Sequence, residues 1–93
     1  MSLSTVQVII EGRVQGVWFR GWMKQEACAR DLRGWVRNRR DGSVEAVIAG
    51  SAEVVDDMVG LCWDGPPAAI VSNVVSRPAR DTGYVGFTYL PTI

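Results

Sequence analysis

The sequence predicts an α+β fold in which two helices cover one face of a mixed, mainly antiparallel sheet. Stretches rich in β-branched residues alternate with two stretches whose apolar residues recur at helical spacing. Glycine- or proline-containing segments separate most of these stretches. The chain has 93 residues and shows no repeat or linker, so we expect a single domain over residues 1–93.

The N-terminal elements follow from the residue pattern. Residues 5–11 are rich in Val and Ile with partial alternation, which predicts a first strand. The glycine-bracketed residues 12–16 predict a loop. An amphipathic helix is then expected over residues 19–30, because apolar side chains recur there at helical spacing. These side chains are Phe19, Met23 and Ala27.

Strands make up most of the rest of the chain. Residues 32–39 and 43–49 predict two strands, and the Asp41-Gly42 pair between them is typical of a tight hairpin. Residues 69–76 and residues 84–90 predict the last two strands. The sheet is therefore expected to contain five strands.

A second helix is expected between the third and fourth strands. Ser51 is the predicted N-cap, and the following carboxylates Glu53, Asp56 and Asp57 suit the positive end of the helix dipole. The Gly65-Pro66-Pro67 segment ends the helix. The apolar face is predicted to consist of Val55, Met58, Val59, Cys62 and Trp63.

The element order is β-α-β-β-α-β with a short last strand, which is the ferredoxin-like, split βαβ arrangement with both helices on one face. Right-handed crossovers make the first and second strands parallel, with the third strand between them. The loop over residues 12–19 and the strand end at Arg37 and Asn38 therefore leave the sheet at the same edge. This shared edge is the predicted location of a functional site.

The loop at this edge has the features of an anion site. It runs straight into a helix N-terminus, where backbone N–H groups lack intrahelical partners and can converge on an anion. Its glycines, Gly12 and Gly16, permit the backbone conformations that anion-binding nests use. Arg20 adds a planar guanidinium that matches two phosphoryl oxygens. The pattern indicates phosphate binding, with an ordinary connection and a surface arginine as the alternative.

The composition narrows the possible chemistry. The chain has no His, and no Cys or carboxylate cluster has the spacing of metal ligands, so we expect neither a metal nor a cofactor. No Gly-Lys-Ser/Thr follows the loop, which argues against a Walker-type site. Neither Cys28 nor Cys62 has an arginine six residues later, which argues against a cysteine-phosphatase loop. Both cysteines are expected to be core thiols.

Charge and hydropathy bear on partners and location. Residues 1–40 hold eight Lys or Arg and three Asp or Glu, whereas residues 41–93 hold two and seven. The basic half is compatible with a small anion, a nucleic acid or merely solvated arginines. No apolar run approaches the ~20 residues that span a bilayer, and no signal peptide is evident. We therefore expect no membrane partner and a cytoplasmic location.

Two signatures resemble those of the acylphosphatase family. Residues 12–20 match glycine, any residue, Val-Gln-Gly-Val, any residue, Phe-Arg. Residues 34–38 and 41–45 match Gly-Trp-Val-any-Asn and Asp-Gly-any-Val-Glu at fitting spacing. The resemblance covers nearly the whole chain. Asp31 stands where the family usually has Gly, and Tyr89 where it is usually aliphatic, and neither departure is expected to touch the catalytic pattern.

The resemblance implies an enzyme that hydrolyses the carboxyl–phosphate bond of acyl phosphates. Arg20 would bind the phosphoryl group and Asn38 would hold the attacking water. The loop amides that would share the phosphoryl group are those of Gln15, Gly16, Val17, Trp18 and Phe19. A small-molecule acyl phosphate would be the substrate, phosphate and sulfate would compete with it, and a monomer without a nucleic-acid partner is expected.

The chemistry is compatible with these residues, and alternatives remain open. A carboxylate leaving group has a pKa of about 4, so it departs without a general acid. The rival function is a non-catalytic ferredoxin-like module that binds RNA or an anion, since residues 33–37 faintly resemble the start of an RNA-recognition motif. Taken alone, Asn38 could be a turn residue. Trp22 and Trp35 are interpreted as packing residues, and the side chain of Gln15 has no assigned role.

Overall fold

The element order of the protein is the predicted one. The computed structural model describes residues 2–93, so Met1 of the predicted domain lies outside the described residues. The elements are β1 (Leu3–Arg13), α1 (Phe19–Ala29), β2 (Arg33–Asn38), β3 (Val44–Ser51), α2 (Ala52–Cys62), β4 (Ile70–Pro78) and β5 (Phe87–Leu90).

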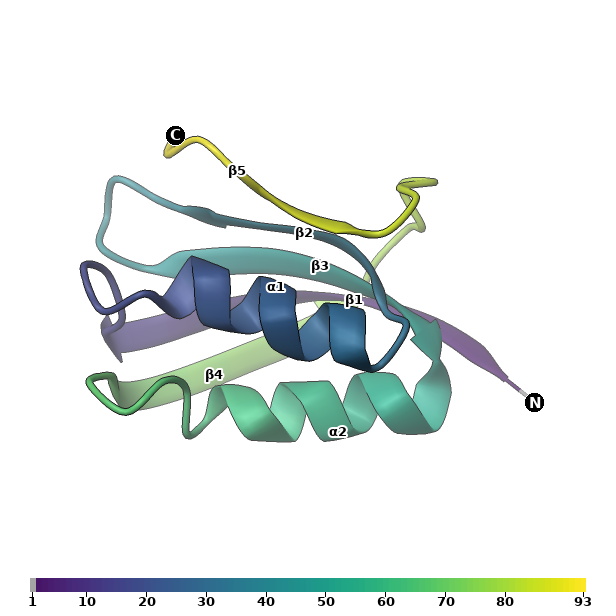
Figure 1. Ribbon diagram of the computed structural model, residues 1–93, viewed down its shortest axis with the longest axis horizontal. Helices are drawn as coiled ribbons and strands as arrows, with labels where there is room; N and C mark the ends of the chain where they lie inside the picture. The colour runs from purple at the N-terminus through teal and green to yellow at the C-terminus, as the bar shows by residue number, and fades with distance from the viewer. Residues whose placement is uncertain (1) are drawn as a thin grey trace.

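The five strands form one sheet in the order β4-β1-β3-β2-β5. Strand β3 pairs antiparallel with both β1 and β2, so β1 and β2 run parallel with β3 between them, as the crossover rule predicted. The edge strand β5 pairs with β2 in parallel. Both helices lie on the same face of the sheet and run in opposite directions (Figure 1). The loop after β1 and the end of β2 consequently meet at one edge.

The core lies between the helix layer and the sheet. Alternate residues of the strands point toward the helices, and each fully buried aliphatic or aromatic side chain contributes roughly 1.5–3 kcal/mol. Helix α1 contributes Phe19, Met23 and Ala27, which are the residues that the helical spacing predicted. The largest fully buried strand residues are Val8, Ile10, Val36, Val44 and Ile48. This core holds the N-terminus of α1 against the ends of β1 and β2.

Ser51 is the N-cap residue of α2, as predicted, although its side chain makes no capping hydrogen bond. Two other expectations about the helices were wrong. Trp63 follows the last helical residue and is 50% exposed, because the apolar stripe of α2 ends with the helix. Cys28 is exposed on α1, whereas Cys62 is buried in the core as predicted. Burial raises the pKa of the Cys62 thiol to about 12, so this thiol is inert as a nucleophile.

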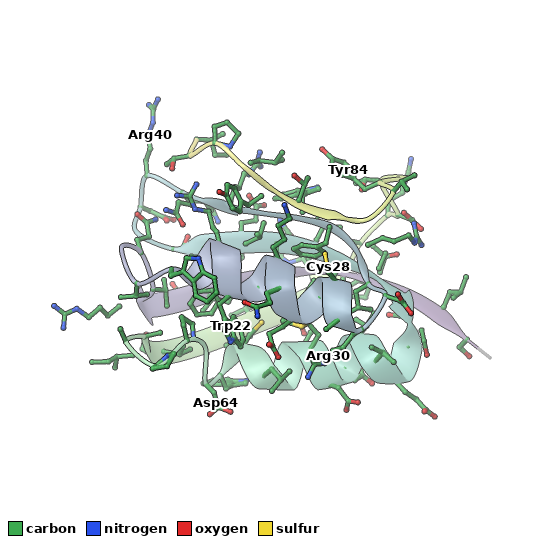
Figure 2. The ribbon with its side chains drawn as sticks, viewed as in Figure 1. Trp22, Cys28, Arg30, Arg40, Asp64 and Tyr84 are labelled. Atoms are coloured by element: carbon green, nitrogen blue, oxygen red, sulfur yellow. The ribbon has the colours of Figure 1, made fainter. Side chains whose placement is uncertain are left out.

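The tryptophans Trp22 and Trp35 both pack, but in different places. Trp22 of α1, labelled in Figure 2, lies partly buried against the core. It packs edge-on to Phe19, with ring centroids 5.2 Å apart. Trp35 lies on the helix-free face of the sheet, because it alternates with the buried Val36. Its ring is covered by the guanidinium of Arg37, whose Cζ atom is 4.6 Å from the ring centroid.

Two segments depart from the regular elements. The last strand begins at Phe87 and not at residue 84, because Gly83 and Gly86 have φ angles of 75° and 77° that break the extended backbone. Asp31, after α1, has a φ of 56° and so adopts the left-handed conformation for which glycine is favoured. This conformation costs Asp31 about 1 kcal/mol or more relative to glycine.

No helix within residues 2–93 is both long enough and apolar enough to cross a bilayer.

Candidate active site

A cavity of about 170 Å³ opens at the edge where the β1–α1 loop meets the end of β2. Its walls come from the loop, the first turn of α1, and the strands β2 and β5. The lining residues are Val14, Gly16, Trp18, Phe19, Arg20, Gly21, Asn38 and Tyr89. The structure therefore brings Arg20 and Asn38 together, as the predicted topology required.

The loop backbone beside this cavity has several N–H groups without a partner among residues 2–93. None of the N–H groups of residues 15–19 donates a hydrogen bond to another atom of residues 2–93. Gly16 and Trp18 adopt left-handed conformations, with φ angles of 72° and 68°. Left-handed residues interspersed in a loop turn successive N–H groups toward one point, which is the geometry of an anion-binding nest. The positive end of the α1 dipole lies at the same place and would also attract an anion.

Arg20 has no carboxylate partner within 4.0 Å among residues 2–93. Its Nη1 atom donates to the backbone oxygen of Leu90 at 3.3 Å, and its Cζ atom lies 5.4 Å from the ring centroid of Tyr89. By contrast, Arg30, Arg33, Arg37 and Arg39 each lie near a carboxylate. The charge of Arg20 is therefore available to an anion in the cavity.

Asn38 is held by backbone pairing on both sides of β2. It pairs with Val44 of β3, and its backbone oxygen accepts a hydrogen bond from the N–H of Ile93 at 3.2 Å. Its side-chain Oδ1 atom is buried and has no hydrogen-bond partner within residues 2–93. An unsatisfied buried acceptor costs about 1–3 kcal/mol, so this atom is a candidate contact for a water or a substrate.

The turn after Asn38 is stabilised by another residue. Asp41 Oδ1 accepts hydrogen bonds from the backbone N–H of Ser43 at 2.9 Å and from its hydroxyl at 2.6 Å. These Ser43 donors hold the pKa of the Asp41 carboxyl below its ordinary value. Figure 2 shows Arg40 projecting away from the sheet at the tip of this hairpin. The side chain of Asp41 therefore stabilises the turn, whereas the side chain of Asn38 lines the cavity.

Gln15 and Val17 do not line the cavity with their side chains. Val17 packs against the core, partly buried. The Gln15 amide nitrogen donates to the backbone oxygens of Arg39 at 2.7 Å and Ser43 at 2.9 Å. Gln15 thus connects the loop that carries the free N–H groups to the hairpin that follows Asn38, a role that the sequence pattern had left open.

Tyr89 lines the cavity, so the expectation that it would not touch the catalytic pattern was wrong. It pairs with Val36 in the sheet and therefore projects toward the helix layer beside α1. Besides Arg20, the Lys24 ammonium lies 5.7 Å from its ring centroid. The sequence offered no signal for this placement, because it depends on β5 pairing beside β2.

Among residues 2–93, no group of three or more His, Cys, Asp or Glu side chains is arranged to hold a metal ion. Of the described residues that line the cavity, Arg20 is the one with a charged side chain.

Comparison with known proteins agrees with this geometry. A family model described as Acylphosphatase matches residues 6–89. The chain belongs to the acylphosphatase family. A curated acylphosphatase of Bradyrhizobium diazoefficiens is 56% identical over the whole of both chains. Another, of Rhodopseudomonas palustris strain BisB5, is 52% identical over the whole of both chains. The predicted family is confirmed, and so is the assignment of the chain as an enzyme.

Solved acylphosphatases have the same fold. The crystal structure of the Bacillus subtilis acylphosphatase superposes with a TM-score of 0.89 at 34% identity, covering 96% of this chain and 99% of that one. The Coxiella burnetii acylphosphatase gives a TM-score of 0.91 at 34% identity, covering 95% and 93%. The predicted ferredoxin-like fold is therefore confirmed for this acylphosphatase-family chain.

Proposed function

We propose that the protein hydrolyses acyl phosphates to a carboxylate and inorganic phosphate, with Arg20 and the loop amides binding the phosphoryl group and Asn38 positioning the water. The observation that carries this proposal is which side chains line the cavity. Arg20 and Asn38 line it together, and within residues 2–93 the arginine has no carboxylate partner and the buried amide oxygen has no hydrogen-bond partner. The first suits a phosphoryl anion and the second suits a nucleophilic water.

The phosphoryl group occupies the nest formed by the N–H groups of residues 15–19. Each N–H that donates to a charged oxygen makes a stronger hydrogen bond than it would to a neutral acceptor. The guanidinium of Arg20 donates to two phosphoryl oxygens at once, which fixes their orientation as well as balancing their charge. These donors are in place before the substrate binds, so little reorganisation is needed as charge develops.

Asn38 acts on the nucleophile. Its Oδ1 accepts a hydrogen bond from the water, which leaves a lone pair of the water oxygen free to face phosphorus. In phosphoryl transfer the attacking and leaving oxygens lie roughly in line, so a group that fixes the water also fixes the path of the reaction. The pairing of Asn38 with Val44 and Ile93 keeps its backbone in place during this step.

The hydrolysis needs no side chain of the protein to donate or accept a proton. The oxygen of the water forms a bond to phosphorus while the bond from phosphorus to the carboxyl oxygen breaks. The carboxylate departs with the electron pair of that bond, unprotonated, because its pKa is about 4. The proton lost by the water passes to a phosphoryl oxygen, so the products are a carboxylate and dihydrogen phosphate. This route is compatible with a chain that has no His.

The rival RNA-binding function is disfavoured by the contacts on the helix-free face. Arg37 covers the Trp35 ring, which would otherwise be the platform for a stacked base. The same arginine pairs with Glu45 at 2.9 Å, and Arg33 pairs with Asp81 at 2.8 Å. Ion pairing of Arg33 and Arg37 reduces the positive charge that β2 offers to the phosphates of a nucleic acid.

We further propose that inorganic phosphate and sulfate compete with substrate at the nest, and that the protein acts as a cytoplasmic monomer. Competition follows because both anions present oxygens to the same donors.

A hydrolysis assay tests the function. Protein dialysed against EDTA is expected to hydrolyse benzoyl phosphate at an undiminished rate, and to cleave an alkyl phosphate such as glycerol phosphate far more slowly, because the alkoxide is a poor leaving group. Phosphate release and benzoate release are measured together. Absence of hydrolysis, or activity that returns only with added divalent metal, would refute the proposed chemistry.

A further inference from the structure

Trp18 and Tyr89 are large aromatic side chains that line the cavity and yet remain 61% and 52% exposed. The other lining residues either belong to the core or serve the phosphoryl group and the water. An acyl phosphate also carries an acyl group, which must contact something beside the phosphoryl site. The two rings supply apolar surface at that position.

The local structure around Trp18 places its indole at the cavity at an energetic cost. Its left-handed backbone, with a φ of 68°, costs a non-glycine residue about 1–2 kcal/mol. The indole lies over the first turn of α1, where a Cβ atom on Gly21 would collide with it. Strained backbone of this kind concentrates at functional sites. The arrangement therefore presents the indole to the cavity and not to the core.

The ring of Tyr89 is held from the α1 side. The Cζ atom of Arg20 lies 5.4 Å and the Nζ atom of Lys24 lies 5.7 Å from the ring centroid, and these cations sit one helical turn apart. Strand pairing with Val36 fixes the backbone. The exposed remainder of the ring therefore faces the cavity mouth in a defined orientation.

We propose that Trp18 and Tyr89 bind the acyl group, and that Tyr89 makes the site favour acyl phosphates whose acyl group has a flat apolar body, aromatic or unsaturated, over those with small acyl groups. This rests on the proposed acylphosphatase activity. The phosphoryl contacts are the same for every substrate, so discrimination must come from the acyl side. Aromatic surface packs best on flat apolar groups, whereas an acetyl group is too small to cover either ring.

The test compares benzoyl phosphate with acetyl phosphate for the wild type, Tyr89→Leu and Tyr89→Phe, and measures the inhibition constant for inorganic phosphate in each. In Tyr89→Leu we expect kcat/KM for benzoyl phosphate to fall about 3- to 10-fold, with a change below about twofold for acetyl phosphate. Tyr89→Phe should keep the wild-type ratio. The matched control is Thr88→Val, since Thr88 neighbours Tyr89 in β5 but pairs with Trp35 on the opposite face.

Three results would overturn the inference. An unchanged benzoyl-to-acetyl ratio in Tyr89→Leu would remove Tyr89 from acyl recognition. Equal losses for both substrates, with a weaker phosphate inhibition constant, would mean that Tyr89 acts only by holding Arg20. A wild-type preference for succinyl phosphate over benzoyl phosphate would mean that the Lys24 ammonium, and not the Tyr89 ring, recognises the acyl group, because the succinyl group carries a second carboxylate. If the wild type hydrolyses neither benzoyl nor acetyl phosphate, the proposed function itself fails and this inference falls with it.

Discussion

Arg37 and Asn38 are neighbours in β2, but their side chains lie on opposite faces of the sheet and differ in their hydrogen bonding. On the helix-free face, Arg37 donates from Nε to Glu45 at 2.9 Å, and Gln7 donates to the same carboxylate at 2.7 Å. On the helix face, the Asn38 Oδ1 atom is buried with no partner among residues 2–93. The Glu45 carboxylate on one face is therefore satisfied within the protein, whereas Asn38 Oδ1 on the other face is not.

The difference separates groups that the fold satisfies from groups to which the proposed function assigns a part in the reaction. A buried polar group is normally hydrogen-bonded, and an exception calls for an explanation. The two arginines show the same contrast, because Arg37 has a carboxylate partner whereas Arg20 has none within residues 2–93. The helix-free face is therefore expected to respond to substitution in stability, and the cavity in activity.

The largest effect is expected at Arg20. Removing its guanidinium in Arg20→Ala takes away the only charged side chain lining the cavity, so kcat/KM should fall on the order of 10³-fold. Binding of inorganic phosphate should be lost as well. Arg20→Lys should recover little, because an ammonium cannot donate to two oxygens from one plane. Steady-state kinetics and phosphate titration on folded protein check this, and an Arg20→Ala variant that binds phosphate normally would exclude Arg20 from the anion site.

A smaller effect, of a different kind, is expected at Glu45. Its side chain is only 9% exposed, so Glu45→Ala leaves Arg37 without its partner and should lower the free energy of unfolding by about 1–3 kcal/mol. For a domain of this size that corresponds to a drop in Tm of roughly 5–15 °C. The kcat of the folded protein should change less than about twofold.

Thermal melts of Glu45→Ala are compared with those of Glu53→Ala, which removes an exposed carboxylate from the first turn of α2. A Glu45→Ala variant with an unchanged Tm, or with normal Tm and strongly reduced kcat, would contradict the division between the two faces.

The fold and the pairing of Arg20 with Asn38 at one sheet edge could be predicted from the sequence. Both depend on the spacing of apolar residues and on the right-handed crossover between parallel strands. Helical spacing located Phe19, Met23 and Ala27, and the right-handed crossover rule brought the β1–α1 loop to the end of β2. These two facts place Arg20 and Asn38 at one edge before any side-chain geometry is known.

The rest depends on contacts that no local pattern encodes. Tyr89 reaches the cavity only because β5 pairs in parallel with β2, a pairing between segments far apart in the chain. Gln15 donates two hydrogen bonds to backbone oxygens of the hairpin. Every residue has a backbone oxygen, so the sequence of the hairpin gives no sign of this contact. Cys28 was misassigned because its neighbour Ala27 takes the core position on α1.

The central claim is that Asn38 serves the water and not the phosphoryl group or the turn. Its Oδ1 has no protein partner to lose, so Asn38→Ala should change the phosphate inhibition constant less than about threefold and leave the Tm nearly unchanged. Without a fixed nucleophile, kcat should fall by about 100-fold or more. Asn38→Asp should also be poor, since a carboxylate repels the phosphoryl anion. The matched control is Asn73→Ala, because Asn73 is an exposed asparagine of β4.

The most direct measurement is therefore the ratio of two effects on one preparation of Asn38→Ala: the change in kcat for benzoyl phosphate and the change in the inhibition constant for phosphate. The account predicts a kcat that collapses by about 100-fold or more while phosphate binding stays close to that of the wild type. A folded Asn38→Ala protein with near-normal kcat, or one that loses kcat and phosphate binding in equal measure, would contradict it.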